Sequence, residues 1–333
     1  LVQVTEDAGS TWRKIESFEG VPEMTYVSCL TASPTEADTV YAAFDNHKNG
    51  DFKPYLLVSR DRGRTWRSIA GDLPERDVCY TIQQDHVRSN LLFAGTELAA
   101  YFSIDGGEHW IRLAGVPTIA VRDIAIQRRE NDVVLGTFGR GFYVLDDYSP
   151  LRHVTRERLG EPALLFPVKD AWSYVERSRL GGRNGKGSQG ASFYAAPNPP
   201  FGAVFTWYLK DGLKSRKEAR RRTEKKALEN DETVPYPSLE ELRAEDTELD
   251  PKVFLVVRDD TGAVVQRVPG KQGKGIHRVA WNLRYPSSEP VRLDDDEERP
   301  PWWSPPKGPL ALAGTYTVEL VQRVDCLLYT SDA

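Results

Sequence analysis

The sequence predicts an all-β chain in two parts, a region of repeats followed by a sandwich. The 333 residues include 14 Tyr, 12 Phe and 8 Trp but a single Met, a composition that favours strands over helices. One hairpin motif recurs within the first 150 residues, and strand-like segments resume at Ala203. We therefore expect a repeat domain at residues 1–150, a loop-rich linker at 151–200 and a sandwich at 201–325.

The repeated motif reads VTEDAGSTWRKI from Val4, VSRDRGRTWRSI from Val58 and FSIDGGEHWIRL from Phe102. It recurs at intervals of 54 and 44 residues, and a period of about 40–50 residues is typical of β-propeller blades. All three copies share an Asp, a Gly and a Trp at fixed offsets. These residues are Asp7, Gly9 and Trp12, then Asp61, Gly63 and Trp66, then Asp105, Gly107 and Trp110.

Each shared residue of the motif suits a structural role in a hairpin turn. The Asp carboxylate can accept hydrogen bonds from backbone N–H groups of its own turn. The Gly supplies the positive φ that such a turn requires, and the Trp ring can fill the layer between neighbouring sheets. We therefore predict that the motif serves folding and takes no part in catalysis.

Strand-like segments repeat together with the motif. TVYAAFDN, LLFAGTEL and VVLGTFGR occupy equivalent places, as do YVSCLTAS, CYTIQQDH and VRDIAIQR. Residues 24–70 and 77–114 form complete blades by this pattern, residues 2–18 form the end of an earlier blade, and residues 119–147 lack an outer strand. We expect about three blades of a partial propeller, with the other blades in the same parent chain, of which this chain is a fragment.

The run from NLLFAGTE through GTFGRGFYVLDDYSPLR resembles the bacterial neuraminidase-repeat, or Asp-box, propellers. It resembles more closely the bacterial sortilin-N-terminal-like or "glycosyl hydrolase" repeat proteins. It departs from them at Phe138, where His is more frequent, and at Leu98–Ala99, where a Gly is usual. The resemblance implies a propeller in an exported, extracytoplasmic protein. It implies no activity, because the motif that defines the family is structural.

Ligand-binding candidates come from the loops between the second and third strands of each blade. These loops lie on the rim opposite the Asp-box turns, and they carry Asp45, His47, Glu97 and Arg140. Two carboxylates across a groove could act as general acid and base on a glycosidic bond. The same residues could bind a ligand without catalysis, or form a solvated rim. The arginine triad expected of a sialidase has no recognisable pattern here.

The second part contains strands with one charged insertion. VFTWYLK, VFLVV, AVVQRV, IHRVAWN and AGTYTVELVQRV alternate as strands, and Asp260, Thr261 and Gly262 signal a hairpin turn. Residues 214–247 predict an exposed helix or a disordered insertion, then a short helix that Ser238 and Glu241 cap. Asp259, Gly262, Trp281 and the AGTYTV strand resemble the immunoglobulin-like domain of flagellar hook-capping proteins.

Residues 326–333, CLLYTSDA, are similar to translated adapter sequence, so we predict a non-native tail outside the fold. Cys29 and Cys79 then remain, too few for a disulfide framework, and we expect both to be buried. Trp302–Trp303 could stack on a sugar or cover the sandwich edge. The acidic run 294–298 lacks the ligand spacing of a calcium loop.

Several classes of function are disfavoured. A net charge of −5 argues against a nucleic-acid binder, no run of about 18 apolar residues predicts a membrane span, and no spacing predicts a metal or cofactor. The leading hypothesis is a non-catalytic scaffold that binds a glycan or protein ligand. The alternatives are a glycoside hydrolase, xyloglucanase-like or sialidase-like, whose cleft the missing blades complete, and a structural assembly factor.

Overall fold

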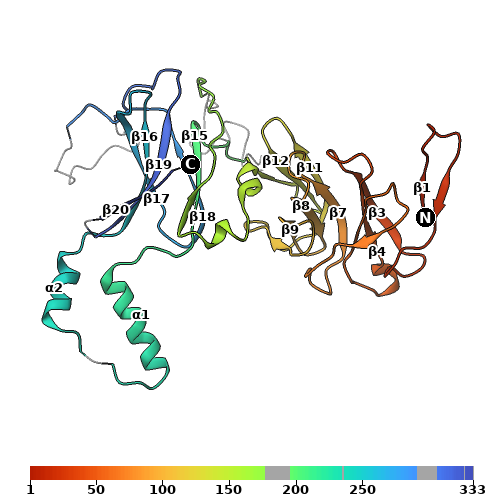
Figure 1. The fold of residues 1–333 in the computed structure, drawn as a ribbon, viewed down its shortest axis with the longest axis horizontal. Helices are drawn as coiled ribbons and strands as arrows, with labels where there is room; N and C mark the ends of the chain where they lie inside the picture. The colour runs from red at the N-terminus through yellow and green to blue at the C-terminus, as the bar shows by residue number, and fades with distance from the viewer. Residues whose placement is uncertain (177–195, 235, 291–305, 326, 333) are drawn as a thin grey trace. The chain divides into compact units, whose positions relative to one another are not determined.

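A computed structural model describes residues 1–176, 196–234, 236–290, 306–325 and 327–332. It is mostly β-structure and divides into two compact units, Leu1–Thr155 and Arg156–Ala333 (Figure 1). The runs 181–190 and 294–298 and the pair Trp302–Trp303 lie outside the described residues.

The first unit is a succession of antiparallel sheets, each a meander in which sequence neighbours pair. A two-stranded N-terminal hairpin comes first, then a first sheet and a second sheet of four strands each, then a third sheet of three strands. The hairpin is β1 (Val2–Val4) and β2 (Arg13–Ile15); the first sheet is β3 (Tyr26–Ala32), β4 (Val40–Asp45), β5 (Tyr55–Ser59) and β6 (Arg67–Ser68); the second sheet is β7 (Cys79–Gln84), β8 (Leu92–Thr96), β9 (Ala100–Ser103) and β10 (Ile111–Arg112); the third sheet is β11 (Val121–Gln127), β12 (Asp132–Thr137) and β13 (Phe142–Leu145).

Successive sheets pack face to face and bury both sides of the second sheet. Tyr41 and Leu56 of the first sheet share one apolar cluster with Ile82 of the second. Phe93 of the second sheet shares another with Val121 and Leu135 of the third. All five residues of β8 are consequently buried. This succession is propeller-like, without a closed ring in the described part of the chain.

The second unit encloses one core between two antiparallel sheets. Trp207, Phe205 and Trp281 from one sheet meet Leu255 and Leu320 from the other. The sheets have strand orders β14-β15-β18 and β17-β16-β19-β20. The strands are β14 (Ala163–Leu165), β15 (Ala203–Leu209), β16 (Lys252–Arg258), β17 (Val264–Gly270), β18 (Gly275–Trp281), β19 (Thr317–Val324) and β20 (Leu327–Asp332).

Two strands lie where the sequence predicted irregular chain. β14 falls in the predicted linker at 151–200 and pairs with β15, because Ala163, Leu164 and Leu165 are apolar enough to be buried there. The same segment contains two short 3-10 helices, Ser149–His153 and Arg158–Gly160. β20 falls in the predicted tail and pairs with β19. Excluding residues 327–332 from the fold was therefore wrong, whatever their origin.

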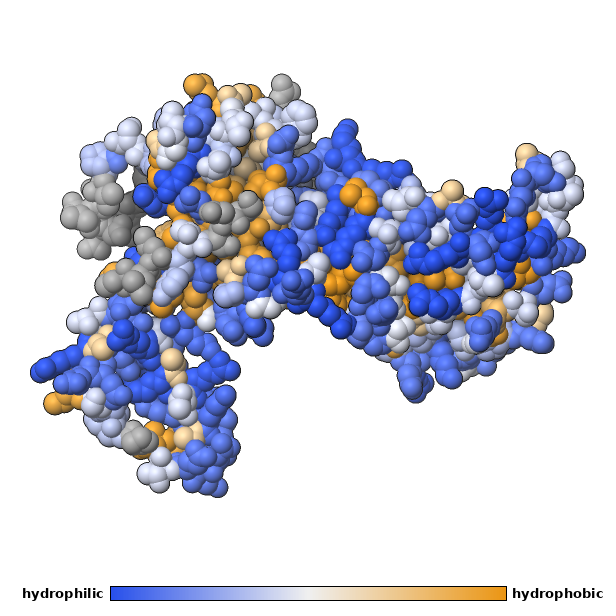
Figure 2. Space-filling view, viewed as in Figure 1, coloured by the Kyte–Doolittle hydropathy of each residue, from blue (hydrophilic) through white to orange (hydrophobic). Residues whose placement is uncertain are grey.

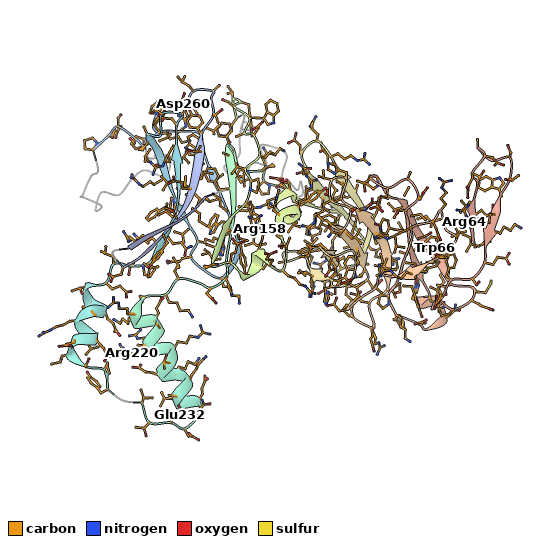
Figure 3. The ribbon with its side chains drawn as sticks, viewed as in Figure 1. Arg64, Trp66, Arg158, Arg220, Glu232 and Asp260 are labelled. Carbon is orange, nitrogen blue, oxygen red and sulfur yellow. The ribbon has the colours of Figure 1, made fainter. Side chains whose placement is uncertain are left out.

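The charged insertion forms two helices, α1 (Arg216–Glu229) and α2 (Leu239–Thr247). Ser215 with Glu218 and Ser238 with Glu241 form capping boxes at their N-termini. The guanidinium of Arg220 (Figure 3) donates to both carboxylate oxygens of Glu245 at 2.6 and 2.8 Å, which joins the two helices. Neither helix buries a residue, and hydrophilic side chains dominate their surface in Figure 2. Among the described residues, no helix has the length and apolar content that a membrane crossing requires.

Candidate functional site

The three Asp-Gly-Trp motifs form the turns between β1 and β2, β5 and β6, and β9 and β10. In the second turn, Asp61 accepts hydrogen bonds from the Thr65 hydroxyl at 2.6 Å and from the Thr65 and Arg64 amides at 2.8 and 2.9 Å. These donors hold the pKa of Asp61 well below its usual range. Gly63 adopts φ +75°, and its amide donates to Ser59. The carboxylate is therefore engaged by its own turn.

The first and third turns repeat this arrangement. The Thr11 hydroxyl and amide lower the pKa of Asp7 to about 2. In the third turn the amide and Nδ1 of His109 lie 3.0 and 2.9 Å from the Asp105 carboxylate. Asp105, Glu108 and His109 are close enough to one another to surround a cation. Because the turn already engages the Asp105 carboxylate, we assign no metal to this group.

The tryptophans of the three turns differ in burial. Trp110 is 7% exposed, and its indole N–H donates to the Ile69 carbonyl of the preceding sheet at 2.9 Å. Trp66 (Figure 3) is half-buried and contacts the ring of Phe18 edge-on at 5.4 Å. Trp12 is 55% exposed and donates only within its own turn, to Gly9. A ring is more buried where more residues that precede its hairpin in the sequence pack over it.

A β-bulge interrupts the first strand of the first, second and third sheets at the same register. The bulges fall between Val27 and Cys29, between Cys79 and Thr81, and between Val121 and Asp123. A bulge leaves one residue without a partner and redirects its side chain. The bulged residues are Ser28, Tyr80 and Arg122. They form an equivalent set across three consecutive sheets, here called the bulge row.

A second set of equivalent residues lies at the end of the second strand of each of these three sheets, β4, β8 and β12. The residues before the bulges pair with Phe44, Thr96 and Thr137. The residues that follow these three are Asp45, Glu97 and Phe138, here called the rim row. Arg140, predicted on the corresponding loop of the third sheet, lies in that loop, two positions beyond Phe138. The register therefore places Phe138, and not Arg140, beside Asp45 and Glu97 in equivalence.

The two rows meet around Tyr80. Its hydroxyl donates a hydrogen bond to the Glu97 carboxylate, and the Arg122 guanidinium lies over its ring at 3.6 Å from the centroid. Arg122 also lies 3.8 Å from Glu97 and 5.7 Å from the ring centre of Phe138. Burial, the bond to Glu97 and the charges of Glu97 and Asp45 raise the pKa of Tyr80 more than Arg122 lowers it. The phenol therefore stays protonated at neutral pH.

A buried carboxylate, Asp77, holds the loop that carries Glu97. It accepts hydrogen bonds from the Thr96 hydroxyl at 2.9 Å, the Leu98 amide at 3.0 Å and the Tyr101 hydroxyl at 3.2 Å. Burial raises the pKa of Asp77 despite these donors. The Glu97 amide itself donates to the Val78 carbonyl at 2.9 Å. These bonds fix the backbone of Glu97 and with it the partner of Tyr80.

Hydrogen bonds to carboxylates also hold the loop after β4 in place. Asp45 accepts from the backbone amide of His47 at 3.0 Å, and its carboxylate lies 2.5 Å from His47 Nδ1. Asp51 accepts from the Tyr55 hydroxyl at 2.6 Å and from the Asn46 side chain at 3.1 Å. Tyr55 is the main cause of a lowered pKa at Asp51. Asp45 and His47 therefore form a pair at the rim, as Tyr80 and Glu97 do.

Sequence reasoning selected Asp45, His47 and Glu97 but missed Tyr80 and Arg122. A partial signal existed, because the repeat alignment places Tyr80 and Arg122 in one column, with Val27 in place of Ser28. Bulges leave no mark of their own in a single sequence, so nothing indicated that this column turns toward the rim. Phe138 was noted only as a departure from the family pattern. It is 69% exposed.

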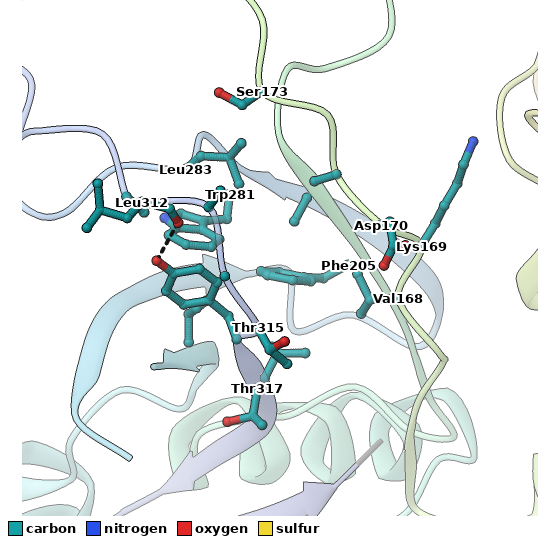
Figure 4. Close-up of a pocket in the computed structure, with 18 residues that line it drawn as sticks. Val168, Lys169, Asp170, Ser173, Phe205, Trp281, Leu283, Leu312, Thr315 and Thr317 are labelled. Atoms are coloured by element: carbon teal, nitrogen blue, oxygen red, sulfur yellow. Dashed lines mark hydrogen bonds between the residues drawn. The ribbon is translucent and has the colours of Figure 1, made fainter. Parts of the chain in front are cut away.

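The second unit has a separate cavity of about 510 Å³ (Figure 4). Phe205 and Trp281 form its floor, and the Tyr316 hydroxyl donates to the Leu312 carbonyl at 2.8 Å beside it. Most of its lining is apolar and continuous with the core of the sandwich. It offers no convergent set of polar groups, so we regard it as the open end of that core.

No family model matches the chain, and no curated protein matches it. Solved structures similar to it include a GH74 enzyme of Niastella koreensis, with 18% identity over 36% of this chain and 21% of that one, at a TM-score of 0.32. The GH74 xyloglucanase of Xanthomonas campestris is 14% identical over 92% of this chain and 38% of that one, with a TM-score of 0.32. PorZ is a surface component of the type-IX secretion system of Porphyromonas gingivalis. It is 14% identical over 98% of this chain and 40% of that one, with a TM-score of 0.34.

The chain thus spans between 21% and 40% of the length of these three proteins. These similarities are too distant to assign it an activity.

Proposed function

We propose that the chain is part of a non-catalytic, propeller-like scaffold that binds a glycan or protein ligand at the rim. The observation that carries this proposal is the convergence of side chains from consecutive sheets around Tyr80. Glu97 comes from the second sheet, and Arg122 and Phe138 come from the third. An exposed aromatic ring can contact an apolar surface of a ligand while the charged groups beside it bind polar groups of the same ligand.

Binding accounts for these side chains better than hydrolysis does. A hydrolase of this kind needs one carboxyl group to donate a proton and a second to attack or to activate water. Here Glu97 accepts the Tyr80 hydroxyl, and Asp45 is held by His47. The Tyr80 phenol is protonated at neutral pH, so it could act as a nucleophile only by passing its proton to Glu97. The hydrolase alternative would need carboxylates from elsewhere in the parent protein.

We also propose that the parent is exported and supplies further blades. This part of the proposal depends on the resemblance of the repeats to those of Asp-box proteins.

A binding screen with rim variants tests the proposal. The whole chain is applied to a glycan array and a peptide array, and Phe138→Ala is compared with Tyr236→Ala, which removes an exposed aromatic ring from the second unit. We expect Phe138→Ala to weaken binding about tenfold, the effect of losing roughly 1.4 kcal/mol of contact, and Tyr236→Ala to leave it unchanged. Equal binding by both variants would contradict a rim site. Turnover of a bound glycan that Glu97→Gln abolishes would favour the hydrolase instead.

A further inference from the structure

Arg122 has hydrogen-bonding capacity that the described residues leave unused. Its guanidinium carries five N–H donors, yet no acceptor lies within hydrogen-bonding distance in the described part of the chain. Its nearest anion, Glu97 Oε2, is 3.8 Å away, beyond a hydrogen bond. That same oxygen accepts the Tyr80 hydroxyl. Glu97 therefore offsets part of the charge of Arg122 without occupying its donors.

The same guanidinium is held in a defined orientation. Its Cζ atom lies 3.6 Å from the ring centre of Tyr80, which is 5% exposed and cannot move aside. The bulge in β11 directs Arg122 toward this ring, and Phe138 flanks it. The Arg122 side chain is nevertheless 44% exposed. A guanidinium held against an aromatic ring and partly open to solvent suits bidentate recognition of a planar anion.

We infer that Arg122 binds a carboxylate of the ligand, and that this ligand is a glycan containing an acidic sugar; this inference rests on the proposed function. The carboxylates of Asp45 and Glu97 favour a glycan with one acidic sugar over a ligand with many carboxylates. Asp45 of the first sheet and Glu97 of the second can accept hydrogen bonds from hydroxyls of the glycan whose carboxylate Arg122 of the third sheet binds. They would repel a peptide or polymer that carries several carboxylates in succession. Phe138 then provides a surface for the C–H face of the sugar ring.

The test compares each acidic ligand with its own neutral form. Oligosaccharides with one glucuronate, galacturonate, mannuronate or sialic acid unit are titrated into the whole chain, beside the same compounds as methyl esters. We expect at least one free acid to bind at least tenfold more tightly than its ester. We expect added salt to reduce that difference, because it screens the charges.

Variants then assign the preference to one side chain. Arg122→Ala should remove the difference between acid and ester. Arg122→Lys keeps the charge but loses the fork, so it should restore less than half of the preference on a logarithmic scale. Arg129→Ala is the matched control, because it removes the same charge from the turn between β11 and β12, where Arg129 is 83% exposed, and should keep the full preference. Melting curves of all three variants check that they are folded.

Each other outcome has a defined meaning. If no acid binds better than its ester while Phe138→Ala weakens neutral glycans, the inference is wrong and the proposed function stands. If binding depends on none of the rim residues, both are wrong. If an acidic peptide binds through Arg122 more tightly than every glycan, the carboxylate site is right and the glycan is wrong. If Arg129→Ala removes the preference as well, Arg122 is not the receptor.

Discussion

At the scale of single residues, Asp85 has the most buried charge in the first unit. It is fully buried in the connection between β7 and β8 and accepts two hydrogen bonds from the Arg152 guanidinium, at 2.8 and 2.7 Å. The Tyr148 hydroxyl and the Arg88 amide donate to it as well. These bonds attach the segment after β13 to the second sheet. They provide an anchor for a third sheet that has no fourth strand in the described residues.

We predict that Asp85→Asn lowers the free energy of unfolding by about 3–5 kcal/mol, the cost of leaving a buried partner charge uncompensated. Asp38→Asn, which breaks an exposed pair with Arg62, should cost less than about 1 kcal/mol. Urea titration of both variants measures the difference. Comparable losses for the two would show that Arg152 finds another partner or that the segment is not anchored through Asp85.

Asp85 also determines part of the acid sensitivity. Hydrogen bonds from Arg152 and Tyr148 lower its pKa in the folded state, although burial alone would raise it. A carboxyl with a lowered folded pKa stabilises the fold above its unfolded pKa, and this contribution is lost as the pH falls through the folded value. Asp85→Asn should therefore flatten the decline in stability below about pH 4. An unchanged acid profile for the variant would contradict this assignment.

At the scale of elements, the three Asp-Gly-Trp hairpins provide an internal comparison. Trp110→Ala should cost about 3–5 kcal/mol, the range for emptying a buried aromatic site. Trp66→Ala should cost less, and Trp12→Ala less than about 1 kcal/mol, because its ring is mostly exposed. Denaturant titration of the three variants tests this order. A large loss at Trp12 would show that its ring is covered in solution.

Contact between sheets depends on one glycine in particular. A Cβ at Gly95 in β8 would lie 2.7 Å from both the Thr81 side chain and the Val121 carbonyl. At Gly136, the equivalent residue of β12, it would meet only Asp123, at 3.5 Å. We predict that Gly95→Ala destabilises the first unit by about 1–3 kcal/mol, whereas Gly136→Ala is neutral or slightly stabilising. Equal effects in a thermal melt would contradict the close approach of the second and third sheets.

The elements themselves were largely predictable, and their precise register was not. Alternation and turn residues indicated each meander in the first unit, and a capping pattern indicated α2 at Ser238. The bulges at Ser28, Tyr80 and Arg122 depend on how two strands pair. The alignment by sequence alone therefore places Gly139 opposite Asp45 and Glu97, where the pairing places Phe138. β14 was missed because three apolar residues in an irregular segment are too few to establish a period.

At the scale of the whole molecule, the sequence predicted two all-β parts of different kinds, and the structure contains two β-rich units. The pairs that join distant segments could not be predicted, since Asp85 and Arg152 are 67 residues apart. The cluster around Tyr80 needed the same long-range information. Glu97 was selected from its loop, but its partner Tyr80 became visible only when β7 and β8 were paired.

The third sheet exposes a strand edge together with apolar side chains. β13 pairs only with β12 in the described residues, and Phe142 and Val144 on it are 79% and 54% exposed. On β3, Tyr26 is 70% exposed, and Met24 just before that strand is 94% exposed. An unpaired edge with exposed apolar side chains is a template for association with another strand.

We therefore predict that the purified chain self-associates in a concentration-dependent manner. Val144→Lys should shift sedimentation toward the monomer, because a lysine on an edge strand opposes pairing with a second chain. Tyr236→Lys, at an 87% exposed position in the second unit, is the control and should not change association. A chain that sediments as a monomer at every concentration, and that does not bind a hydrophobic dye, would contradict the prediction. Association that Val144→Lys leaves intact would place the contact elsewhere than at β13.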